Sequence, residues 1–182
     1  MTATFVRVSK FLSLVLRHSP EQIGLVLDAN GWADVDALIE QAAAHGMRLT
    51  REEIAHVVAT SDKQRFALDE PGNRIRANQG HSVDIDLALE PAQPPALLFH
   101  GTAITSLPAI RAEGLKAGRR QHVHLSPDEA TATKVGRRHG KPVVLRVRTG
   151  EMRSAGAIFY LSVNGVWLTD TVPPGYIEFP TT

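Results

Sequence analysis

The chain has 182 residues, of which 43% are hydrophobic and 21% charged, a balance typical of folded globular proteins and not of disordered or fibrous ones. No stretch approaches the roughly 20 uninterrupted apolar residues that a membrane span needs, and the first ten residues lack the apolar core of a secretory signal. We therefore expect a cytosolic protein that binds no membrane. The absence of cysteine excludes disulfides, thiolate metal sites and cysteine nucleophiles.

Charge is distributed unevenly along the chain. Residues 1–86 carry nine Lys and Arg against twelve Asp and Glu, whereas residues 87–182 carry eleven against seven. The mildly acidic front half argues against general binding of a nucleic-acid duplex by that half. Fifteen of the 20 basic residues are arginine, whose planar guanidinium binds phosphate or carboxylate through two donors. Local anion sites are therefore expected.

The first part of the chain has three helical patterns. Apolar residues recur with helical spacing over residues 5–16, and the helix should end at Arg17 and His18. A second helical pattern runs from Trp32 to Ala42. Thr50 and Glu53 then form a capping-box pattern, which predicts the start of a third helix.

A β-hairpin pattern follows the three helices. Residues 65–68 and 74–77 alternate in polarity around a Pro-Gly-Asn turn, as the two strands of a hairpin do. Three short helices and a hairpin together predict a winged-helix lobe over residues 1–86. Residues 87–95 contain three prolines and no periodic pattern, which is typical of a linker between lobes.

Residues 96–182 alternate between short helices and strands and predict a second lobe, so that the whole chain belongs to the α+β class. The expected strands are 96–100, 123–126, 141–148, 158–163, 166–169 and 176–179, and the expected helices are 106–115 and 126–136. The second of these helices should have Ser126 as its N-cap and Glu129 as its capping-box partner. Asn164 and Gly165 predict a type I′ turn between two strands.

Common nucleotide and metal fingerprints are absent from the sequence. The chain has no Walker pattern, no Rossmann glycine pattern and no HExxH motif. His122 and His124 lie two apart on a predicted strand and so share one face, but no nearby carboxylate completes a ligand set. We predict no metal site.

Several polar clusters could bind an anion, although each also has an ordinary structural explanation. Arg17 and His18 could simply complement the dipole of the helix that they end. The charged residues around 63–66 and 74–82 could protect an edge strand from aggregation, although segment 74–82 offers an unusual density of anion donors around a glycine. The basic cluster at 136–141 is either a solvated loop or part of a site.

Seven strings, in order, closely resemble the KptA-type RNA 2′-phosphotransferases and cover nearly the whole chain. They are LRHSP (16–20), DKQRF (62–66), IRANQGHS (75–82), HGT (100–102), HVHLS (122–126), VGRRHGKP (135–142) and NGVWLT (164–169). The resemblance implies an N-terminal winged-helix lobe and, over residues 96–182, an ADP-ribosyltransferase-like split-sheet lobe that binds NAD. NAD is implied as a co-substrate, and no metal is implied.

The resemblance also implies roles for individual residues. The catalytic tetrad would consist of Arg17, His18, Arg65 and Arg138. The adjacent Arg137 is an alternative to Arg138 for the fourth position. The NAD contacts would be His100, Gly101, Thr102, His124, Leu125, Ser126 and Val166, followed by Trp167. The contacts to RNA or phosphate would be Lys63, Gln64, Arg76, Asn78, Gln79, His81, Ser82 and Arg137.

The implied reaction removes an internal 2′-phosphate from RNA in two steps. The phosphate attacks the nicotinamide ribose of NAD, and the resulting 2′-phospho-ADP-ribosylated RNA then yields 2′-OH RNA and ADP-ribose 1″,2″-cyclic phosphate. The expected partners are RNA with a 2′-phosphate and NAD, the expected state is a monomer, and tRNA splicing is one setting for the activity. Two alternatives remain open: an ADP-ribosyltransferase that caps terminal phosphates of RNA or DNA, and a non-catalytic winged-helix protein that binds nucleic acid.

Overall fold

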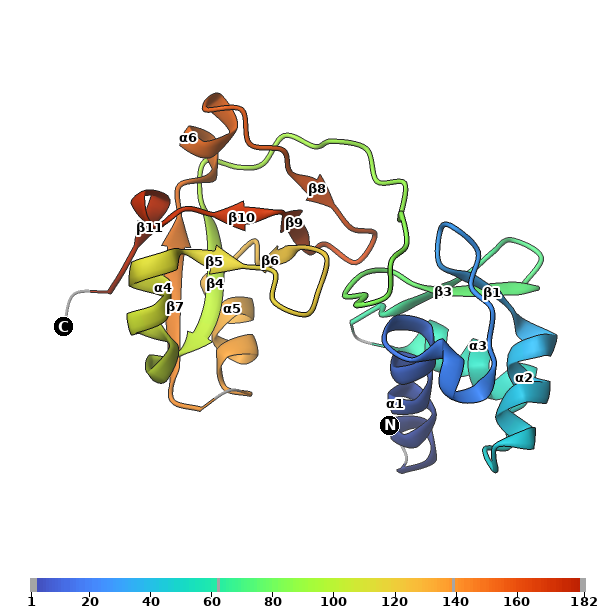
Figure 1. Cartoon of the computed structure of the whole chain (residues 1–182). Coiled ribbons are helices and arrows are strands. Elements are labelled where there is room, and N and C mark those ends of the chain that lie inside the picture. Colours follow the sequence, from blue (N-terminus) through green and yellow to red (C-terminus); the bar gives the residue numbers. More distant parts are fainter. Residues whose placement is uncertain (1–2, 62, 139, 181–182) are drawn as a thin grey trace. The chain divides into compact units, whose positions relative to one another are not determined.

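The computed structural model describes residues 3–61, 63–138 and 140–180. The chain divides into two compact units, Met1–Ala88 and Leu89–Thr182, which we call unit 1 and unit 2 (Figure 1). Each unit has its own cluster of buried apolar side chains. Helices and short antiparallel strands are mixed along the chain, as predicted for an α+β protein.

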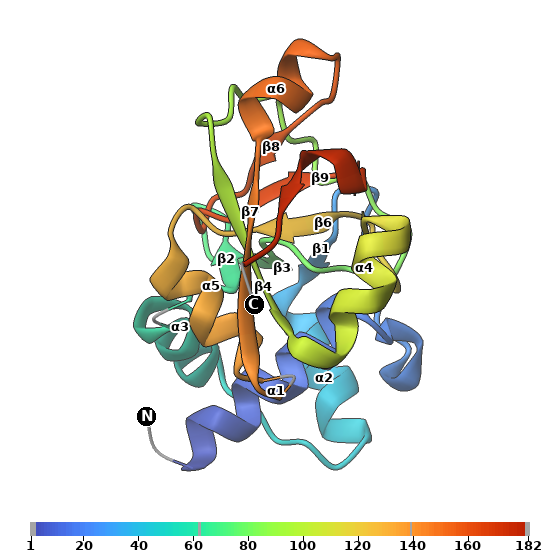
Figure 2. The same cartoon turned by 90° about the vertical axis from the view of Figure 1, so that its left-hand side faces the viewer.

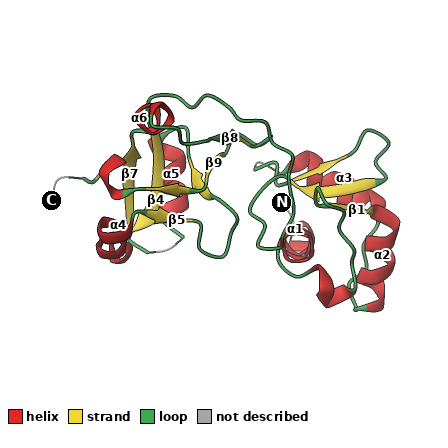
Figure 3. Cartoon of the chain, turned by 45° about the horizontal axis from the view of Figure 1, so that its top comes forward, coloured by secondary structure: helices red, strands yellow, loops and turns green. Residues whose placement is uncertain are grey.

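The described residues of unit 1 form three α-helices and one three-stranded sheet (Figure 3). Its elements are α1 (Ala3–Arg17), η1 (Pro20–Ile23), β1 (Trp32–Asp34), α2 (Val35–Ala44), α3 (Arg51–Thr60), β2 (Phe66–Leu68) and β3 (Arg74–Ala77). The strands are antiparallel in the order β1-β3-β2. The predicted hairpin is therefore confirmed, and it gains a third strand that the sequence analysis did not predict.

The helices of unit 1 agree with their sequence signals except at one start. The capping box of Thr50 and Glu53 is present at α3. The predicted start of the second helix at Trp32 is wrong, because Asp34 has an extended backbone and its carboxylate accepts the N–H of Ala37 at 2.8 Å. This N-cap begins α2 at Val35 and leaves Trp32 in a strand. One apolar face of α1, with Leu12 and Leu16 fully buried, packs into the core of the unit.

The described residues of unit 2 form two small sheets, a strand pair, three α-helices and two 3-10 helices (Figure 2). Its elements are β4 (Leu98–Ala103), η2 (Ile104–Ser106), α4 (Leu107–Glu113), β5 (Leu115–Lys116), β6 (Val123–Leu125), α5 (Glu129–Gly136), β7 (Pro142–Val147), α6 (Thr149–Ser154), β8 (Tyr160–Leu161), β9 (Trp167–Thr169), β10 (Thr171–Val172), η3 (Pro174–Tyr176) and β11 (Ile177–Glu178). The sheet orders are β11-β7-β4 and β6-β9-β8, and β10 pairs with β5.

The two sheets of unit 2 meet at one bridge. Phe99 of β4 donates its N–H to the carbonyl of Ser126 at 2.9 Å, and Ser126 donates to the carbonyl of Phe99 at 2.7 Å. This bridge places the end of β6 beside β4. Elsewhere, the segment before β4 runs along β8, where Ala92 donates its N–H to the carbonyl of Phe159 at 2.7 Å.

Two local predictions in unit 2 are wrong. The N-cap of α5 is Asp128 rather than Ser126, because the Asp128 carboxylate accepts the backbone N–H of Thr131 at 2.7 Å while Ser126 is used in the bridge. The turn between β8 and β9 is not type I′. Of the pair Asn164 and Gly165, only Gly165 has a left-handed backbone, with φ +76°, and Ser162 closes the loop by donating its N–H to the carbonyl of Val166.

Over the part of the chain that the structure describes, no helix combines the length and apolar character required to cross a membrane.

Candidate functional site

The C-terminal end of α1 is hydrogen-bonded to the segment after β3. The N–H of Ser82 donates to the carbonyl of Arg17 at 2.9 Å, and that of Val83 donates to the same oxygen at 3.3 Å. The Nδ1 atom of His18 lies 2.9 Å from the Oγ of Ser82, whose hydroxyl lies within donating distance of the Arg17 carbonyl, at 3.4 Å. Two separate strings of the sequence, LRHSP and IRANQGHS, are therefore adjacent in unit 1.

The DKQRF string joins the same neighbourhood through the carbonyl of Arg65. This oxygen accepts the N–H of Asn78 at 2.9 Å and the guanidinium of Arg17 at 3.2 Å. The side-chain amide of Asn78 donates to the carbonyl of Gln64, which has a left-handed backbone with φ +39°. Asn78 is 4% exposed, so its amide is used inside the protein to hold the strained turn before Arg65. The first residue of the string, Asp62, lies outside the described residues.

His81 is buried next to these cationic groups. It is 1% exposed, and neither of its ring nitrogens has a hydrogen-bond partner among the residues that the structure describes. Burial, and to a smaller extent the positive charges of Arg17, His18 and Arg76, together lower the pKa of His81 from 6.5 to about 4. The imidazole is therefore neutral at pH 7. At 1% exposure, His81 is a buried neighbour of the residues predicted to bind the anion, and it is not itself accessible to a ligand.

Most of the residues predicted to bind phosphate in unit 1 are thus gathered by the fold. Hydrogen bonds or close electrostatic contacts join Arg17, His18, Gln64, Arg65, Arg76, Asn78, His81 and Ser82. Of the other two, Lys63 is exposed and Gln79 is half-buried. The sequence strings predicted this set, and the pairing of β2 with β3 explains why two of the strings lie side by side.

In unit 2, the HGT and HVHLS strings are joined by histidines. The Nδ1 of His100 donates to the carbonyl of His124 at 3.0 Å, and since a carbonyl can only accept, this nitrogen carries the proton. Leu125 of the second string pairs with Trp167 of β9, which places the NGVWLT string on the next strand, with Val166 directly before it. The predicted NAD-binding strings therefore lie on the neighbouring strands β4, β6 and β9.

Two glycines allow α5 to approach β4 at backbone distance. A Cβ atom on Gly101 would lie 1.7 Å from the carbonyl oxygen of Ala132 in α5, and one on Gly136 would lie 2.8 Å from the carbonyl oxygen of Thr102. Neither position can hold a larger residue unless the helix moves. The glycine of HGT thus fixes the distance between the strand that carries His100 and the helix that leads to Arg137 and Arg138.

Comparison with known proteins agrees with these strings. Residues 3–171 match the family model described as RNA 2′-phosphotransferase, Tpt1 / KptA family. The chain belongs to the Tpt1 / KptA family. Proteins named "Probable RNA 2′-phosphotransferase" are similar over nearly their whole length: one from Streptomyces coelicolor is 57% identical over 96% of this chain and 95% of its own, and one from Agrobacterium fabrum is 59% identical over 93% and 91%. A third, from Hahella chejuensis, is 56% identical over 93% and 91%.

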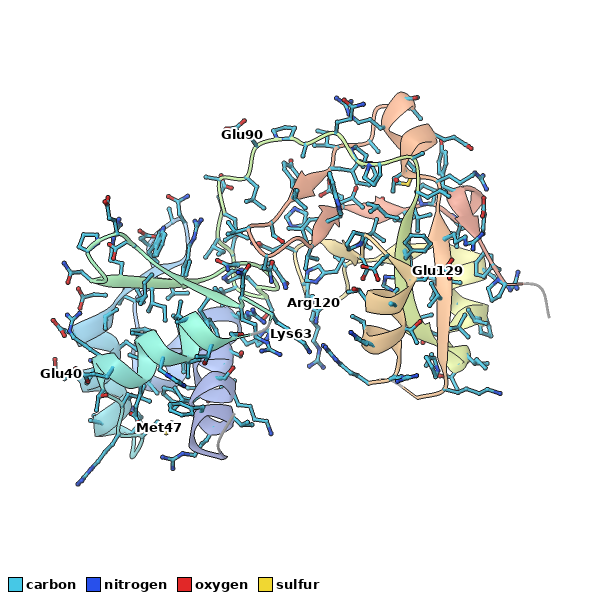
Figure 4. The ribbon with its side chains drawn as sticks, turned by 180° about the vertical axis from the view of Figure 1, so that it is seen from behind. Glu40, Met47, Lys63, Glu90, Arg120 and Glu129 are labelled. Atoms are coloured by element: carbon cyan, nitrogen blue, oxygen red, sulfur yellow. The ribbon has the colours of Figure 1, made fainter. Side chains whose placement is uncertain are left out.

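In this family member, Arg120 is a candidate site residue that was not predicted from the sequence. It lies in the loop between β5 and β6 (Figure 4). Its guanidinium lies 3.2 Å from the Nδ1 of His124, and since a guanidinium only donates, this imidazole nitrogen accepts. Although the side chain is exposed along much of its length, desolvation of the guanidinium and the charge of Arg138 lower its pKa. The Arg119-Arg120 pair, which only Gln121 separates from HVHLS, was the available signal in the sequence.

The predicted arginines after α5 are less constrained. Arg137 and Arg138 are both exposed. The link between Arg138 and this site is electrostatic, because its positive charge lowers the pKa of Arg120. His139 of the same string lies outside the described residues. The assignment of Arg138 to the tetrad, like the roles of the other predicted site residues, stays a prediction.

The residues around β4 and β6 are suited to a dinucleotide. A nicotinamide dinucleotide presents ribose hydroxyls and a pyrophosphate, and the strands and their loops offer imidazole, hydroxyl and guanidinium groups from His100, Thr102, Ser126 and Arg120. A metal has no comparable support: among the described residues, no group of three or more His, Asp and Glu could hold one.

Proposed function

We propose that this chain removes an internal 2′-phosphate from RNA by transferring it to the ADP-ribose part of NAD. The observation that carries the proposal is the hydrogen-bonded cluster of Arg17, His18, Arg65 and Ser82 in unit 1, in a chain whose family is named for this transfer. The proposal includes the finer fold assignments, with unit 1 as a winged-helix lobe and unit 2 as an ADP-ribosyltransferase-like lobe.

Unit 1 would bind the phosphate that leaves the RNA. A 2′-phosphomonoester carries about −1.5 to −2 charges near pH 7, so it needs cationic partners in fixed positions. At about 4 Å and an effective dielectric near 20, one guanidinium contributes on the order of 4 kcal/mol before desolvation is subtracted. Arg17 and Arg65 are the candidates in unit 1, because the Arg17 guanidinium is anchored on the Arg65 carbonyl and Arg17 directly precedes His18 at the end of α1.

Unit 2 would bind the dinucleotide. His100, Gly101 and Thr102 on β4 and His124, Leu125 and Ser126 on β6 are the proposed contacts, with Val166 completing the set. Bound NAD supplies a ribose whose bond to nicotinamide can be broken with release of a neutral leaving group. In unit 2, Arg120 is the first candidate for a phosphate contact because it is anchored on His124, and Arg138, the residue assigned from the sequence strings, is the second.

The proposed reaction has two steps. An oxygen of the RNA 2′-phosphate forms a bond to the anomeric carbon of the nicotinamide ribose, and the bond to nicotinamide breaks. The 2″-hydroxyl of that ribose then attacks the same phosphorus, loses its proton, and displaces the RNA 2′-oxygen, which gains a proton. The products are nicotinamide, 2′-OH RNA and ADP-ribose 1″,2″-cyclic phosphate. Arginine side chains would stabilise the charge that builds on the phosphate oxygens in the second step.

His18 is the proposed acid or base for these proton transfers. Histidine is the member of the tetrad that exchanges a proton near neutral pH, whereas arginine stays charged. The contact between its Nδ1 and Ser82 holds the imidazole in one orientation next to Arg17. We expect His18→Ala to slow the second step more than the first, so that ADP-ribosylated RNA accumulates.

The test is to incubate the full chain with NAD and a short 2′-phosphorylated oligoribonucleotide. The proposal predicts nicotinamide, the cyclic phosphate and dephosphorylated RNA, and Arg65→Ala should remove all three without unfolding the protein. A stable ADP-ribosylated phosphate as the only product would instead indicate the capping activity. RNA binding without any consumption of NAD would indicate the non-catalytic alternative.

A further inference from the structure

The outward face of the unit 1 sheet carries one tryptophan and two arginines. Trp32 of β1 is paired with Arg76 of β3, and Arg74 lies two residues away on the same face of β3. The Arg76 guanidinium lies 4.7 Å from the centroid of the Trp32 ring, and that of Arg74 lies 5.4 Å from it. Both arginines therefore make cation–π contacts with one indole.

The two arginines differ in their acidic partners. Arg74 forms an ion pair with Asp69 at 3.1 Å and approaches Asp28 at 3.7 Å. In contrast, the guanidinium of Arg76 makes no hydrogen bond or ion pair with any described residue, and its Nε is buried without a partner. Arg76 is half-buried, whereas Arg74 is exposed. The arginine in the less exposed position thus has no carboxylate in ion-pair contact, although the charge of Asp28 acts on it from a longer distance.

An unpaired arginine in a desolvated position calls for an anionic partner. Removing water from a guanidinium is unfavourable, and proteins ordinarily compensate it with a carboxylate or with hydrogen bonds. Here burial lowers the pKa of Arg76, and the opposing effect of the Asp28 carboxylate is smaller. Arg76 also shares its neighbour His81 with the positive charges of Arg17 and His18. The surroundings of Arg76 therefore favour binding of an external anion.

We propose that Arg76, held over the ring of Trp32, binds a phosphodiester of the RNA substrate next to the 2′-phosphorylated nucleotide. This inference rests on the proposed function, and it separates two kinds of phosphate. Arg17, His18 and Arg65 take the doubly charged 2′-phosphate, while the single guanidinium of Arg76 takes a singly charged backbone phosphate. Trp32 is a positioning residue for Arg76, and Arg74 has a structural role because its charge is already paired.

The salt dependence of RNA binding tests this assignment without any catalysis. Binding of a labelled, 2′-phosphorylated hexanucleotide is measured by fluorescence anisotropy over a range of salt concentrations in the absence of NAD. For single strands, each phosphate contact contributes about 0.7 to the slope of log K against log salt. We expect Arg76→Gln to reduce the magnitude of the slope by about 0.7, and the matched control Arg74→Gln to leave it unchanged. An unchanged slope for Arg76→Gln would overturn the proposal.

Substrate length tests which phosphate Arg76 binds. We expect Arg76→Gln to lower kcat/KM at least fivefold on the hexanucleotide and to leave it within twofold on a 2′-phosphorylated nucleotide that lacks a phosphodiester. An equal loss on both substrates would place Arg76 on the 2′-phosphate and contradict the inference. Trp32→Phe should keep the length effect and Trp32→Leu should weaken it, with both variants checked for folding by circular dichroism.

The two proposals fail in different ways. If the chain turned over no 2′-phosphorylated RNA, the proposed function would fail while the slope difference between the two arginine variants could still be measured. If turnover were normal and the slopes of the wild type and Arg76→Gln were equal, only the role of Arg76 would be wrong.

Discussion

The Nδ1 atom of His18 lies 2.9 Å from the Oγ of Ser82, and the two residues are 64 positions apart in the chain. The backbone of Ser82 is fixed by a second contact, because its N–H donates to the carbonyl of Arg17. The imidazole is thus oriented by a residue that is itself held on the end of α1. Such an arrangement limits the rotation of the ring that we propose as the acid or base.

Loss of the Ser82 hydroxyl should therefore impair turnover without removing a charged group. One neutral hydrogen bond contributes about 0.5–1.5 kcal/mol, which corresponds to about a two- to tenfold change in rate. We expect Ser82→Ala to lower kcat by this amount. Ser82→Thr keeps the hydroxyl and should lower kcat less. Initial rates with 2′-phosphorylated RNA and saturating NAD measure the effect. Equal kcat values for the alanine variant and the wild type would show that this contact does not orient His18.

Asn78 should act on catalysis through the position of Arg65. Its amide holds the carbonyl of Gln64 and its N–H holds that of Arg65, while Gln64 has an unfavourable left-handed backbone. We expect Asn78→Ala to lower kcat/KM about tenfold, equivalent to about 1.4 kcal/mol, through the misplaced guanidinium of Arg65. Steady-state kinetics measures the loss.

A second substitution separates positioning from simple damage to the fold. Glycine adopts a positive φ at little cost, so Gln64→Gly in the Asn78→Ala background should restore thermal stability by relieving the strained turn. It should not restore kcat/KM, because the guanidinium of Arg65 would still lack its support. Recovery of both quantities together would contradict the positioning role.

The arginines of unit 2 should contribute unequally. Arg120 contacts His124 at 3.2 Å, whereas Arg138 is exposed after the end of α5. A side chain that is already held loses less entropy when it binds a substrate. We expect Arg120→Ala to lower kcat/KM more than a hundredfold, and more than Arg138→Ala does, as measured with the same RNA and NAD. A larger loss for Arg138→Ala would support the assignment made from the sequence strings.

Local signals explain which parts of the fold the sequence predicted. Helix α1, the capping box at Thr50 and the β2–β3 hairpin depend on residues that are close in sequence, and all three were predicted. The strands that were missed are two or three residues long and exist through pairing with distant partners. Trp32 in β1 is paired with Arg76, and Thr171 in β10 is paired with Lys116 of β5. No periodic pattern can develop over so few residues.

In the candidate site, too, local sequence patterns identified single segments, while the contacts between segments depend on tertiary packing. The strings around Arg17 and Ser82 were identified one by one, but their hydrogen bonds follow from the tertiary packing of α1 against the segment after β3. Arg120 has no distinctive local pattern beyond its neighbouring arginine, and its interest comes from the contact with His124. Conversely, Asn78 resembled a phosphate ligand in the sequence, while in the fold its amide is turned to the backbone of Gln64.

The close approach of β4 and α5 predicts a large effect of a single methyl group. A Cβ on Gly101 would lie 1.7 Å from the carbonyl oxygen of Ala132, and the clash is with backbone that cannot rotate away. We expect Gly101→Ala to lower the free energy of unfolding by about 3 kcal/mol or more. The control is Gly175→Ala, where a Cβ would meet no atom within 4 Å. Thermal or urea denaturation compares them, and similar midpoints would contradict the packing.

His81 should make the stability of the protein depend on pH. Its folded pKa of about 4 lies below the ordinary value of 6.5, so the unfolded chain binds a proton more readily than the folded one. The contribution of His81 to the free energy of unfolding is therefore fully present above pH 6.5. As the pH falls from 6.5 towards 4, the free energy of unfolding decreases by about 3 kcal/mol in total.

A variant without the imidazole should remove this part of the pH dependence. Neither ring nitrogen of His81 has a partner among the described residues, so His81→Leu, which is apolar and of similar volume, breaks no hydrogen bond seen in the structure. We expect its free energy of unfolding to equal that of the wild type at pH 7 and to exceed it at pH 5, measured by urea denaturation at both values. Carboxylates such as Asp69 and Asp128, whose pKa values are lowered by backbone N–H groups, lose their contribution at lower pH in both proteins. Parallel pH curves for the two proteins between 6.5 and 5 would show that His81 takes up its proton as readily in the fold as in the unfolded chain.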